Sequence, residues 1–580
     1  MATHSELVAG ILSDRIEALA GPPDEAHSID LDACWDTKFC GQVVLPLAFL
    51  YCRAVPGNRW HGHPVLLEAV ERAGRRLADE IAPDRDWVWM RRTGYPLIHA
   101  FGLMRDRLAA PEAWEDTIVR LLRDLFFPEV REREMLTRFS SANVGYGTNH
   151  LAIELSMLCA FVSVFREETI RSVAMPDCED PIGYLKEYLA RFMAYMDPAG
   201  YWPETDGPAN LYNTLTANSL LCCAMDLGEV DTYRSHFEGA AHFHTRYVFP
   251  NLASAGVTDG RNRQGRGGIQ RGAFLGFLPE GRALLRLARE RTAASKGRHR
   301  LSGEALSSLL TDITAEPHFV AGQASLCWDA EQFTDTIRDD FAMVKRGPWM
   351  ASLSNFRFRP RPEAHFTLDY QNLFSLYHRR FGTVLCGNNS KSDPELATFS
   401  KRFRSFDGYP VDEPMIQYVP DRGSFDIRED GFTLLREYRG FEGVVELRIR
   451  SDRRAELILR ANARLSEYPI TCSLQPACGF KDGHGNRVAI EEELLCLSGT
   501  DLGGAITLQP ETQPDVTSAD AGHPIRLAIP HEAELVWPFK GWDCYNLETD
   551  RHEKPQGWTC VLRIPVPRDG ARVLVESVDS

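Results

Sequence analysis

The chain has 580 residues, of which 44% are hydrophobic and 25% charged, and its formal net charge at pH 7 is −16. This is the composition of an ordinary globular protein, and a chain of this length folds as roughly two to four domains rather than around one core. The negative charge argues against a general nucleic-acid-binding protein, although an anionic small substrate would need only a local basic pocket.

No stretch of the sequence approaches the length and apolarity of a membrane span. Residues 1–7 lack the basic-then-apolar order of a secretory signal. We therefore expect no membrane partner and a cytoplasmic location, or a periplasmic one if a signal has been removed. The 14 cysteines are scattered and form no CxxC pair, which is typical of free thiols in a reducing compartment. The sequence leaves a homo-oligomer open.

The first half of the chain shows apolar residues at helical spacing, in segments joined by loops that contain Pro, Gly and Asp. The predicted helices are residues 6–19, 40–52, 64–81, 111–127, 151–165, 181–196, 211–227, 232–248, 272–290 and 303–313. Because these segments share no fixed period, a strict solenoid is not expected. We predict an (α/α) toroid of helical hairpins whose loops at one end form a cleft, with an irregular helical array as the alternative.

The pattern changes near residue 316, where short alternating stretches separated by turn residues begin to predict β-strands. The predicted strands are residues 349–355, 374–377, 382–386, 443–449, 455–459, 534–537, 558–564 and 572–576. Few helical runs lie between them, which favours an antiparallel β-sandwich. Helices followed by strands indicate segregated domains of an α+β multidomain protein. We predict a toroid domain over residues 1–320 and a sandwich domain, with room for subdivision, over residues 321–580.

The first stretch with candidate chemistry is residues 145–154, where a glycine-broken turn leads into an apolar helix. Asn149 and His150 lie in the first helical turn, and polar groups at a helix mouth can line a cleft. His150 and Glu154 are four residues apart and therefore share one face of the helix. The alternative is that Asn149 caps the helix and His150 is an ordinary packed or surface histidine.

The second stretch is residues 197–216, a loop that enters the helix predicted from residue 211. Tyr212 and Asn213 lie on the first turn of that helix, where their side chains can face a cleft. Glu204 and Asp206 lie in the loop before it. The alternative is that Tyr212 packs with its hydroxyl in water and that the two acids are solvated.

The third stretch is the glycine-rich loop of residues 259–271, whose four arginines stand out in an acidic protein. They are Arg261, Arg263, Arg266 and Arg271. Guanidinium groups bind carboxylate or sulfate through two hydrogen bonds, and glycines allow the backbone to approach a ligand closely. The loop lacks the spacing of a nucleotide phosphate loop. A solvated loop without a ligand is the alternative.

The fourth stretch is residues 363–378, in the region of predicted strands. His365 and Asp369 can orient one another, reach a cleft, or hold a divalent metal such as zinc or calcium. Ordinary polarity on a sheet surface is the alternative.

Together these stretches resemble a known family. Residues 148–154 look like the Asn-Asn-His…Glu helix start of heparinase II/III-like polysaccharide lyases, and residues 200–213 are similar to their Asp-Gly…Glu-Gly-Pro-x-Tyr-His segment. Residues 365–375 resemble their His-x-His-x-Asp-x-Leu-Ser-Phe segment. The resemblance covers roughly residues 140–400 and departs at Thr148, which replaces the first Asn, and at the sheet motif, which keeps a single His. It implies an α-toroid followed by a β-sandwich.

The resemblance also implies a reaction, the β-elimination of a uronic acid in an acidic oligo- or polysaccharide. Asn149 would neutralise the carboxylate, with help from an arginine of the loop at 261–271. Tyr212 would shuttle protons, His150 or His365 would be the second proton-transfer group, and Glu154 would orient His150. Glu204 and Asn213 would contact the substrate, and no cofactor is required.

Two other functions remain open. One is a glycoside hydrolase on the same helical scaffold, with Glu204 and Asp206, or Glu154, as the carboxylate pair. The other is a carbohydrate-binding protein without catalysis. Water incorporation at the anomeric carbon would indicate the hydrolase, whereas a new double bond in the product would indicate the lyase.

Overall fold

The structure is a computed structural model in which most of the chain is described. The described residues are 3–33, 42–80, 87–122, 148–173, 180–203, 207–258, 269, 271–294, 303–356, 373–385, 397–406, 409–417, 420–463, 470–474, 480–482, 495–498, 500–508, 524–537 and 561–578. Among them, no helix is both long and apolar enough to cross a lipid bilayer.

The chain divides into two compact units. The helical unit comprises Met1–Thr205, Tyr212–Thr245 and Ile269–Ser325, and the sheet unit comprises Asp206–Leu211, Arg246–Gly268 and Leu326–Ser580. The last α-helix ends at Ala315 and the first strand begins at Gln332. The simple division at residue 320 stays a prediction, because two short segments from the helical half of the sequence group with the strands.

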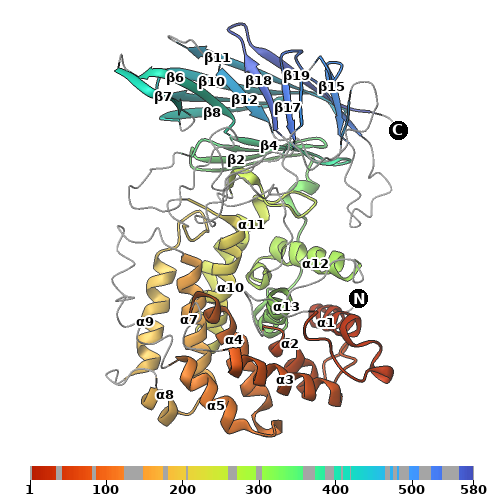
Figure 1. Cartoon of the computed structure of the whole chain (residues 1–580), viewed down its shortest axis with the longest axis vertical. Helices are drawn as coiled ribbons and strands as arrows, with labels where there is room; N and C mark the ends of the chain where they lie inside the picture. Colours follow the sequence, from red (N-terminus) through yellow and green to blue (C-terminus); the bar gives the residue numbers. More distant parts are fainter. Residues whose placement is uncertain are drawn as a thin grey trace. The chain divides into compact units, whose positions relative to one another are not determined.

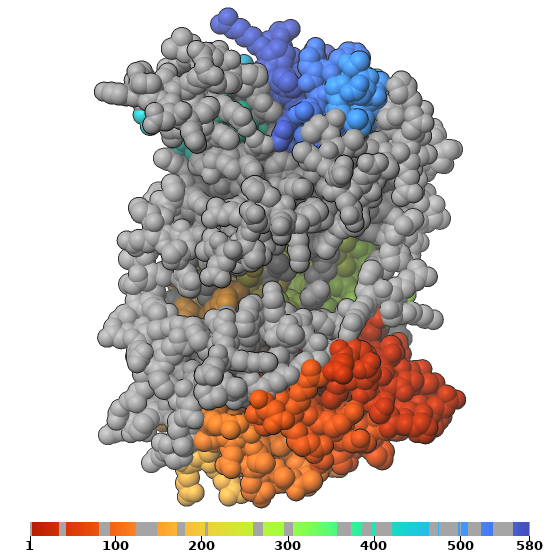
Figure 2. Space-filling model, in the orientation of Figure 1, coloured from red at the N-terminus to blue at the C-terminus, as the bar shows by residue number. Residues whose placement is uncertain are grey.

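The helices carry the labels of Figure 1. They are α1 (His4–Ala20), α2 (Val44–Cys52), α3 (Pro64–Glu80), α4 (Trp87–Met104), α5 (Pro111–Arg120), α7 (Thr148–Val164), α8 (Glu167–Val173), α9 (Pro181–Ala194), α10 (Asn210–Asp226), α11 (Arg234–Arg246), α12 (Pro279–Ala294) and α13 (Gly303–Ala315). The first helices form one continuous surface, coloured red to orange in Figure 2.

The end of the helical unit packs against its beginning. Helix α1 contacts both α12 and α13, and α2 contacts α13. Helix α1 starts with a capping box in which Thr3 and Glu6 bond each other's backbone amides. Next to this cap, His4 Nε2 lies 3.2 Å from the Asp312 carboxylate of α13. The ends of the helical series are therefore joined by a buried polar contact.

Helix α7 packs between α4 and α9 (Figure 1). Glycines allow the close approach to α4, because a Cβ on Gly94 would lie 1.9 Å from the sulfur of Met157, and one on Gly102 would lie 3.0 Å from Val164. Helix α7 is buried around nearly its whole circumference, as expected of a helix that is apolar on all sides.

The sheet unit contains three antiparallel sheets. The five-stranded sheet has the order β1 (Gln332–Ile337), β2 (Phe341–Arg346), β3 (Trp349–Ser354), β4 (Phe374–His378) and β5 (Gly382–Leu385). The eight-stranded sheet has the order β13 (Phe480–Asp482), β15 (Ala505–Leu508), β16 (Ile525–Ala528), β19 (Ala571–Ser577), β11 (Arg454–Ala463), β10 (Phe441–Ser451), β9 (Gly431–Tyr438) and β8 (Arg422–Arg428). The six-stranded sheet has the order β14 (Leu495–Ser498), β17 (Glu534–Trp537), β18 (Val561–Val566), β12 (Ile470–Leu474), β6 (Phe399–Phe406) and β7 (Tyr409–Gln417).

Inward-facing residues of all three sheets share one hydrophobic core. In β9, for example, Phe432 and Leu434 face that core while Thr433 and Leu435 are only half-buried, which is the period-two alternation of a strand with one covered face. The predicted order of helices followed by antiparallel strands is confirmed. The closure of the helices into a toroid and the sandwich packing of the sheets stay predictions.

Three helical details differ from the sequence prediction, the first being that the short helix α8 was not predicted. Helix α4 was not predicted, because Gly94, Pro96 and Gly102 are typical helix breakers. The predicted helix at residues 272–290 is instead a 3₁₀ turn, Ala273–Phe277, followed by α12. Pro279 occupies the first position of α12, where its missing N–H costs no hydrogen bond.

Candidate functional site

The first turns of α7 and α10 are tied to the same dipeptide, Trp202–Pro203. The Thr148 hydroxyl donates a hydrogen bond to the Pro203 carbonyl over 2.7 Å, and the Asn213 side-chain amide donates one to the Trp202 carbonyl over 2.8 Å. Trp202 is itself buried, and its indole N–H donates to the Phe192 carbonyl of α9. The helix starts that carry Asn149 and Tyr212 are therefore held next to each other within the helical unit.

Asn149 is fully buried in the first turn of α7. Neither its Oδ1 nor its Nδ2 has a hydrogen-bond partner among the described residues. A buried polar group without a partner costs roughly 1–3 kcal/mol, so such a group needs a specific explanation. An amide whose acceptor oxygen and N–H donors have no partner among the described residues suits a ligand with both kinds of group.

Asn213, by contrast, uses both ends of its amide. Its Nδ2 donates to the Trp202 carbonyl, so its Oδ1, 3.3 Å from His244 Nε2, is the acceptor of the second bond. His244 is buried against Phe243 and Phe274, and this burial lowers its pKa to about 3. The imidazole is therefore neutral at neutral pH, and the Asn213 contact assigns its proton to Nε2.

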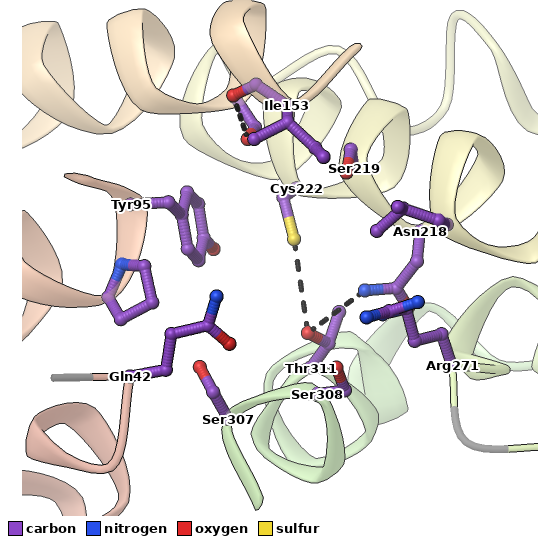
Figure 3. Close-up of a pocket in the computed structure, with 13 residues that line it drawn as sticks. Gln42, Tyr95, Ile153, Asn218, Ser219, Cys222, Arg271, Ser307, Ser308 and Thr311 are labelled. Carbon is purple, nitrogen blue, oxygen red and sulfur yellow. Dashed lines mark hydrogen bonds between the residues drawn. The ribbon is translucent and has the colours of Figure 1, made fainter. Parts of the chain in front are cut away.

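A pocket of about 70 Å³ lies inside the helical unit (Figure 3). Residues from α4, α7, α10 and α13 surround it, together with two residues outside these helices. The lining residues are Gln42, Tyr95, Pro96, Ile153, Ser156, Leu215, Asn218, Ser219, Cys222, Arg271, Ser307, Ser308 and Thr311. Among these described residues most are amides and hydroxyls, and Arg271 is the one guanidinium.

Helical spacing relates the pocket to the predicted site residues. Ile153 and Ser156 line the pocket at positions i+4 and i+7 from Asn149, and residues at this spacing share a helix face. On α10, Leu215 and Ser219 stand in the same relation, i+3 and i+7, to Tyr212. Asn149 and Tyr212 therefore belong to the two helix faces that continue into the pocket.

The electrostatics of this region favour an anion. Ile153 and Ser307 line the pocket from the second turns of α7 and α13, and the effect of a helix dipole fades beyond the first turn, so the two dipoles contribute little here. Arg271 adds a full positive charge at the same pocket. A carboxylate or sulfate would therefore be stabilised here.

The other predicted site residues fall into two groups. His150 is half-buried in the first turn of α7, Glu154 is buried one turn later, and Tyr212 is half-buried on α10. Their roles stay predictions. The rest lie outside the described residues, and they are Glu204, Asp206, Arg261, Arg263, Arg266, His365 and Asp369.

The predicted zinc or calcium site near His365 and Asp369 also lies outside the described residues. Within the described part of the chain, no group of three His, Cys, Asp or Glu side chains is placed to hold a metal ion. A metal site therefore stays a prediction.

The sequence did not reveal His244 or the pocket. His244 lies in an ordinary amphipathic helix, and only the fold shows that its ring meets Asn213. A signal for the pocket existed in α10, where Asn218 and Ser219 interrupt an apolar run of a deeply buried helix. Gln42 and Thr311 come from opposite ends of the helical unit and carry no local signal.

No protein-family model and no curated protein matches this chain. Among solved structures, it is similar to a heparinase III, with 10% identity and a TM-score of 0.48 over 100% of this chain and 86% of that one. It is also similar to the Streptomyces coelicolor A3 chondroitin AC lyase in complex with chondroitin sulphate, with 10% identity and a TM-score of 0.45 over 99% and 96% of the two chains. A second heparinase III, the BT4657 gene product, gives 10% identity and a TM-score of 0.45 over 99% and 84%. With TM-scores below 0.5, these likenesses say nothing about which residues act or on what substrate.

Proposed function

We propose that this chain is a lyase that cleaves uronic-acid-containing glycans by β-elimination. One observation carries the proposal: the Asn149 amide is fully buried at the start of α7, and neither of its polar atoms has a partner among the described residues. A uronate supplies both missing partners, because its carboxylate accepts from Nδ2 and a ring hydroxyl can donate to Oδ1.

The chemistry explains why a buried amide at a helix start is useful. The C5 proton of a uronate is very weakly acidic while the adjacent carboxylate carries its full charge. Removing that proton moves further negative charge onto the carboxylate, and preorganised donors stabilise this charge in the transition state. In our proposal the Asn149 Nδ2 and the positive end of the α7 dipole provide that stabilisation, and an arginine of the loop at residues 261–271 adds a positive charge.

The bonds, electrons and protons of the elimination balance without a further reactant. A base takes the C5 proton, the electron pair forms the C4–C5 double bond, the C4–O bond breaks, and the leaving glycosidic oxygen takes up a proton. We assign Tyr212 to proton transfer, with His150 or His365 as the second group and Glu154 as the residue that orients His150. Asn213 positions Tyr212 through the Trp202 and His244 contacts.

The proposal extends to the scaffold and the substrate. The helices form a toroid, the sheets form a sandwich, and the loop with Arg261, Arg263 and Arg266, together with Glu204, contributes to binding of an acidic glycan. No step of this scheme needs a metal ion.

The test is a screen of uronate polymers and oligosaccharides for new double bonds, read as ultraviolet absorbance of the unsaturated uronate. The reaction is run in ¹⁸O-labelled water, and the products are analysed by mass spectrometry. We expect absorbance to rise and no label to enter the anomeric carbon. Label at that carbon without a rise in absorbance would identify a hydrolase, and binding without any bond cleavage would identify a carbohydrate-binding protein; either result contradicts the proposal.

A further inference from the structure

The pocket of the helical unit extends beyond the proposed reaction centre. Its residues on α7 lie four and seven positions after Asn149, which is about 6–10 Å further along the helix axis at 1.5 Å per residue. A pyranose ring spans a comparable length. The volume of about 70 Å³ is enough for roughly five water molecules, so the pocket admits part of one sugar ring rather than a continuing chain.

The lining has the chemistry of a site for a polyol with one anionic group. Eight of the thirteen described lining residues carry a hydroxyl or an amide, Pro96, Ile153 and Leu215 provide apolar surface, and no described lining residue is a carboxylate. Burial raises the pKa of the Cys222 thiol to about 12, so this thiol adds no negative charge. Among the described lining residues, Arg271 therefore carries the charge at neutral pH.

Asn218 marks the point where a ligand hydroxyl would bind. Its side chain is 6% exposed, and its Nδ2 donates to the Thr311 hydroxyl over 3.4 Å. Its Oδ1 has no partner among the described residues. Figure 3 shows Asn218 beside Thr311 and Arg271 at the pocket. An acceptor without a donor, buried in a polar pocket, fits a sugar hydroxyl that donates to it.

We propose that this pocket receives the end of the terminal sugar ring of an acidic oligosaccharide, with a ring hydroxyl on Asn218 Oδ1 and the anionic substituent on Arg271, so that the enzyme acts from a chain end. Cleavage from a chain end rests on the proposed lyase function. Binding of a sugar in the pocket does not depend on that function. A substrate that enters with its end in the pocket places the first glycosidic bond, and no internal one, at Asn149.

Binding is tested with glucuronate as the probe and glucose as the uncharged comparison, by ligand-observed NMR and calorimetry. Two variants probe the pocket, Asn218→Leu and Arg271→Gln. The matched control is Arg191→Gln, which replaces an exposed arginine of α9 outside the pocket. We expect both pocket variants to bind glucuronate at least tenfold more weakly, and the control to bind it normally. Unchanged affinity in Arg271→Gln overturns the assignment, and this variant decides the matter if Asn218→Leu does not fold.

The mode of action is tested by product length. A uronate oligosaccharide of defined length is digested, and the products of the first few per cent of conversion are sized by mass spectrometry. We expect one short end product and the chain shortened by that unit. A ladder of internal fragments would overturn the end-binding inference while leaving the lyase intact. Glucuronate binding that the two variants weaken, without any elimination, would uphold the pocket and reject the lyase.

Discussion

Thr148 and Asn213 donate hydrogen bonds to consecutive carbonyls, those of Pro203 and Trp202, over 2.7 and 2.8 Å. Two residues 65 positions apart in the sequence are thereby bonded to the same short backbone segment. Their sequence neighbours are Asn149 and Tyr212, the amide and the phenol of the proposed elimination. The relative placement of these two groups therefore depends on a short backbone segment that itself takes no part in the chemistry.

The first prediction concerns this anchoring. Asn213→Leu removes both bonds and leaves the Trp202 carbonyl and His244 Nε2 without their partner, so we expect a loss of stability of about 1–3 kcal/mol per buried group and a lower kcat. Urea unfolding and initial rates measure the two effects.

The second anchor is tested by Thr148→Val, which should lower kcat with a smaller loss of stability than Asn213→Leu. Thr117→Val is the control, because the Thr117 hydroxyl donates to the Ala113 carbonyl of its own helix. A similar kcat in the Thr148 and Thr117 variants would contradict the account.

The second prediction concerns proton transfer. Tyr212→Phe keeps the ring and removes the hydroxyl, so we expect kcat to fall by about 10²–10⁴-fold while the affinity for a uronate ligand changes little. Single-turnover absorbance measures the rate, and calorimetry measures the affinity. Turnover within tenfold of wild type would exclude Tyr212 as the proton shuttle.

The third prediction is the pH dependence that comes from His244. Its pKa in the folded protein is about 3, below the ordinary value of 6.5, because the ring is buried. Between these two values the unfolded chain binds a proton that the folded chain does not, so stability falls as the pH falls from about 6.5 towards 3. His244→Gln should lose less stability than wild type between pH 7 and pH 5 in urea unfolding. His27→Gln, at an exposed position, is the matched control; equal pH slopes in all three proteins would contradict the assignment.

The fourth prediction concerns the contact that joins the first and last helices. Burial would raise the pKa of Asp312, but the Arg289 charge and the hydrogen bonds from His4 and Arg289 outweigh it and lower that pKa. The stabilisation is therefore present above the ordinary aspartate pKa and is lost as the pH falls through the lowered value. Asp312→Asn leaves Arg289 buried without its counter-charge, and we expect a loss of about 3–5 kcal/mol.

The control for this pair is Glu290→Gln, which breaks the more exposed pair of Glu290 with Arg286 on the same helix. A surface pair of this kind contributes about 0–1 kcal/mol. Urea unfolding at neutral pH measures both losses. An equal loss in the two variants would mean that the contact between α1, α12 and α13 does not stabilise the helical unit.

The parts of the fold that depend on local patterning could be predicted from the sequence. Helical spacing predicted α7 and α10, and alternation predicted strands such as β10 and β19. Helix α4 could not be predicted, because its Gly94 and Gly102 serve the packing against α7, which no local rule contains. The contact between His244 and Asn213 could not be predicted either, because it is long-range and nothing near His244 in the sequence indicates it.

For the candidate site, too, residues with a local signal could be predicted from the sequence, whereas long-range contacts could not. Asn149 was singled out because a polar residue at the start of an apolar helix is a local signal. Its burial without a hydrogen-bond partner among the described residues is a property of the folded chain. The pocket brings together Gln42, Asn218 and Thr311, and their meeting depends on how the helices pack. Sequence motifs therefore pointed to Asn149 and Tyr212 as candidates, and the structure was needed to find the pocket.

The most direct test of the central claim measures elimination by Asn149 variants on a substrate that the wild type cleaves. Asn149→Ala and Asn149→Asp are compared with wild type and with Ser163→Ala, an exposed substitution later in the same helix. We predict a loss of about 10²–10³-fold in kcat for Asn149→Ala, a larger loss for Asn149→Asp because a second carboxylate repels the substrate, and unchanged circular dichroism and unfolding cooperativity. Normal turnover by Asn149→Ala would contradict the claim that this buried amide neutralises the substrate carboxylate.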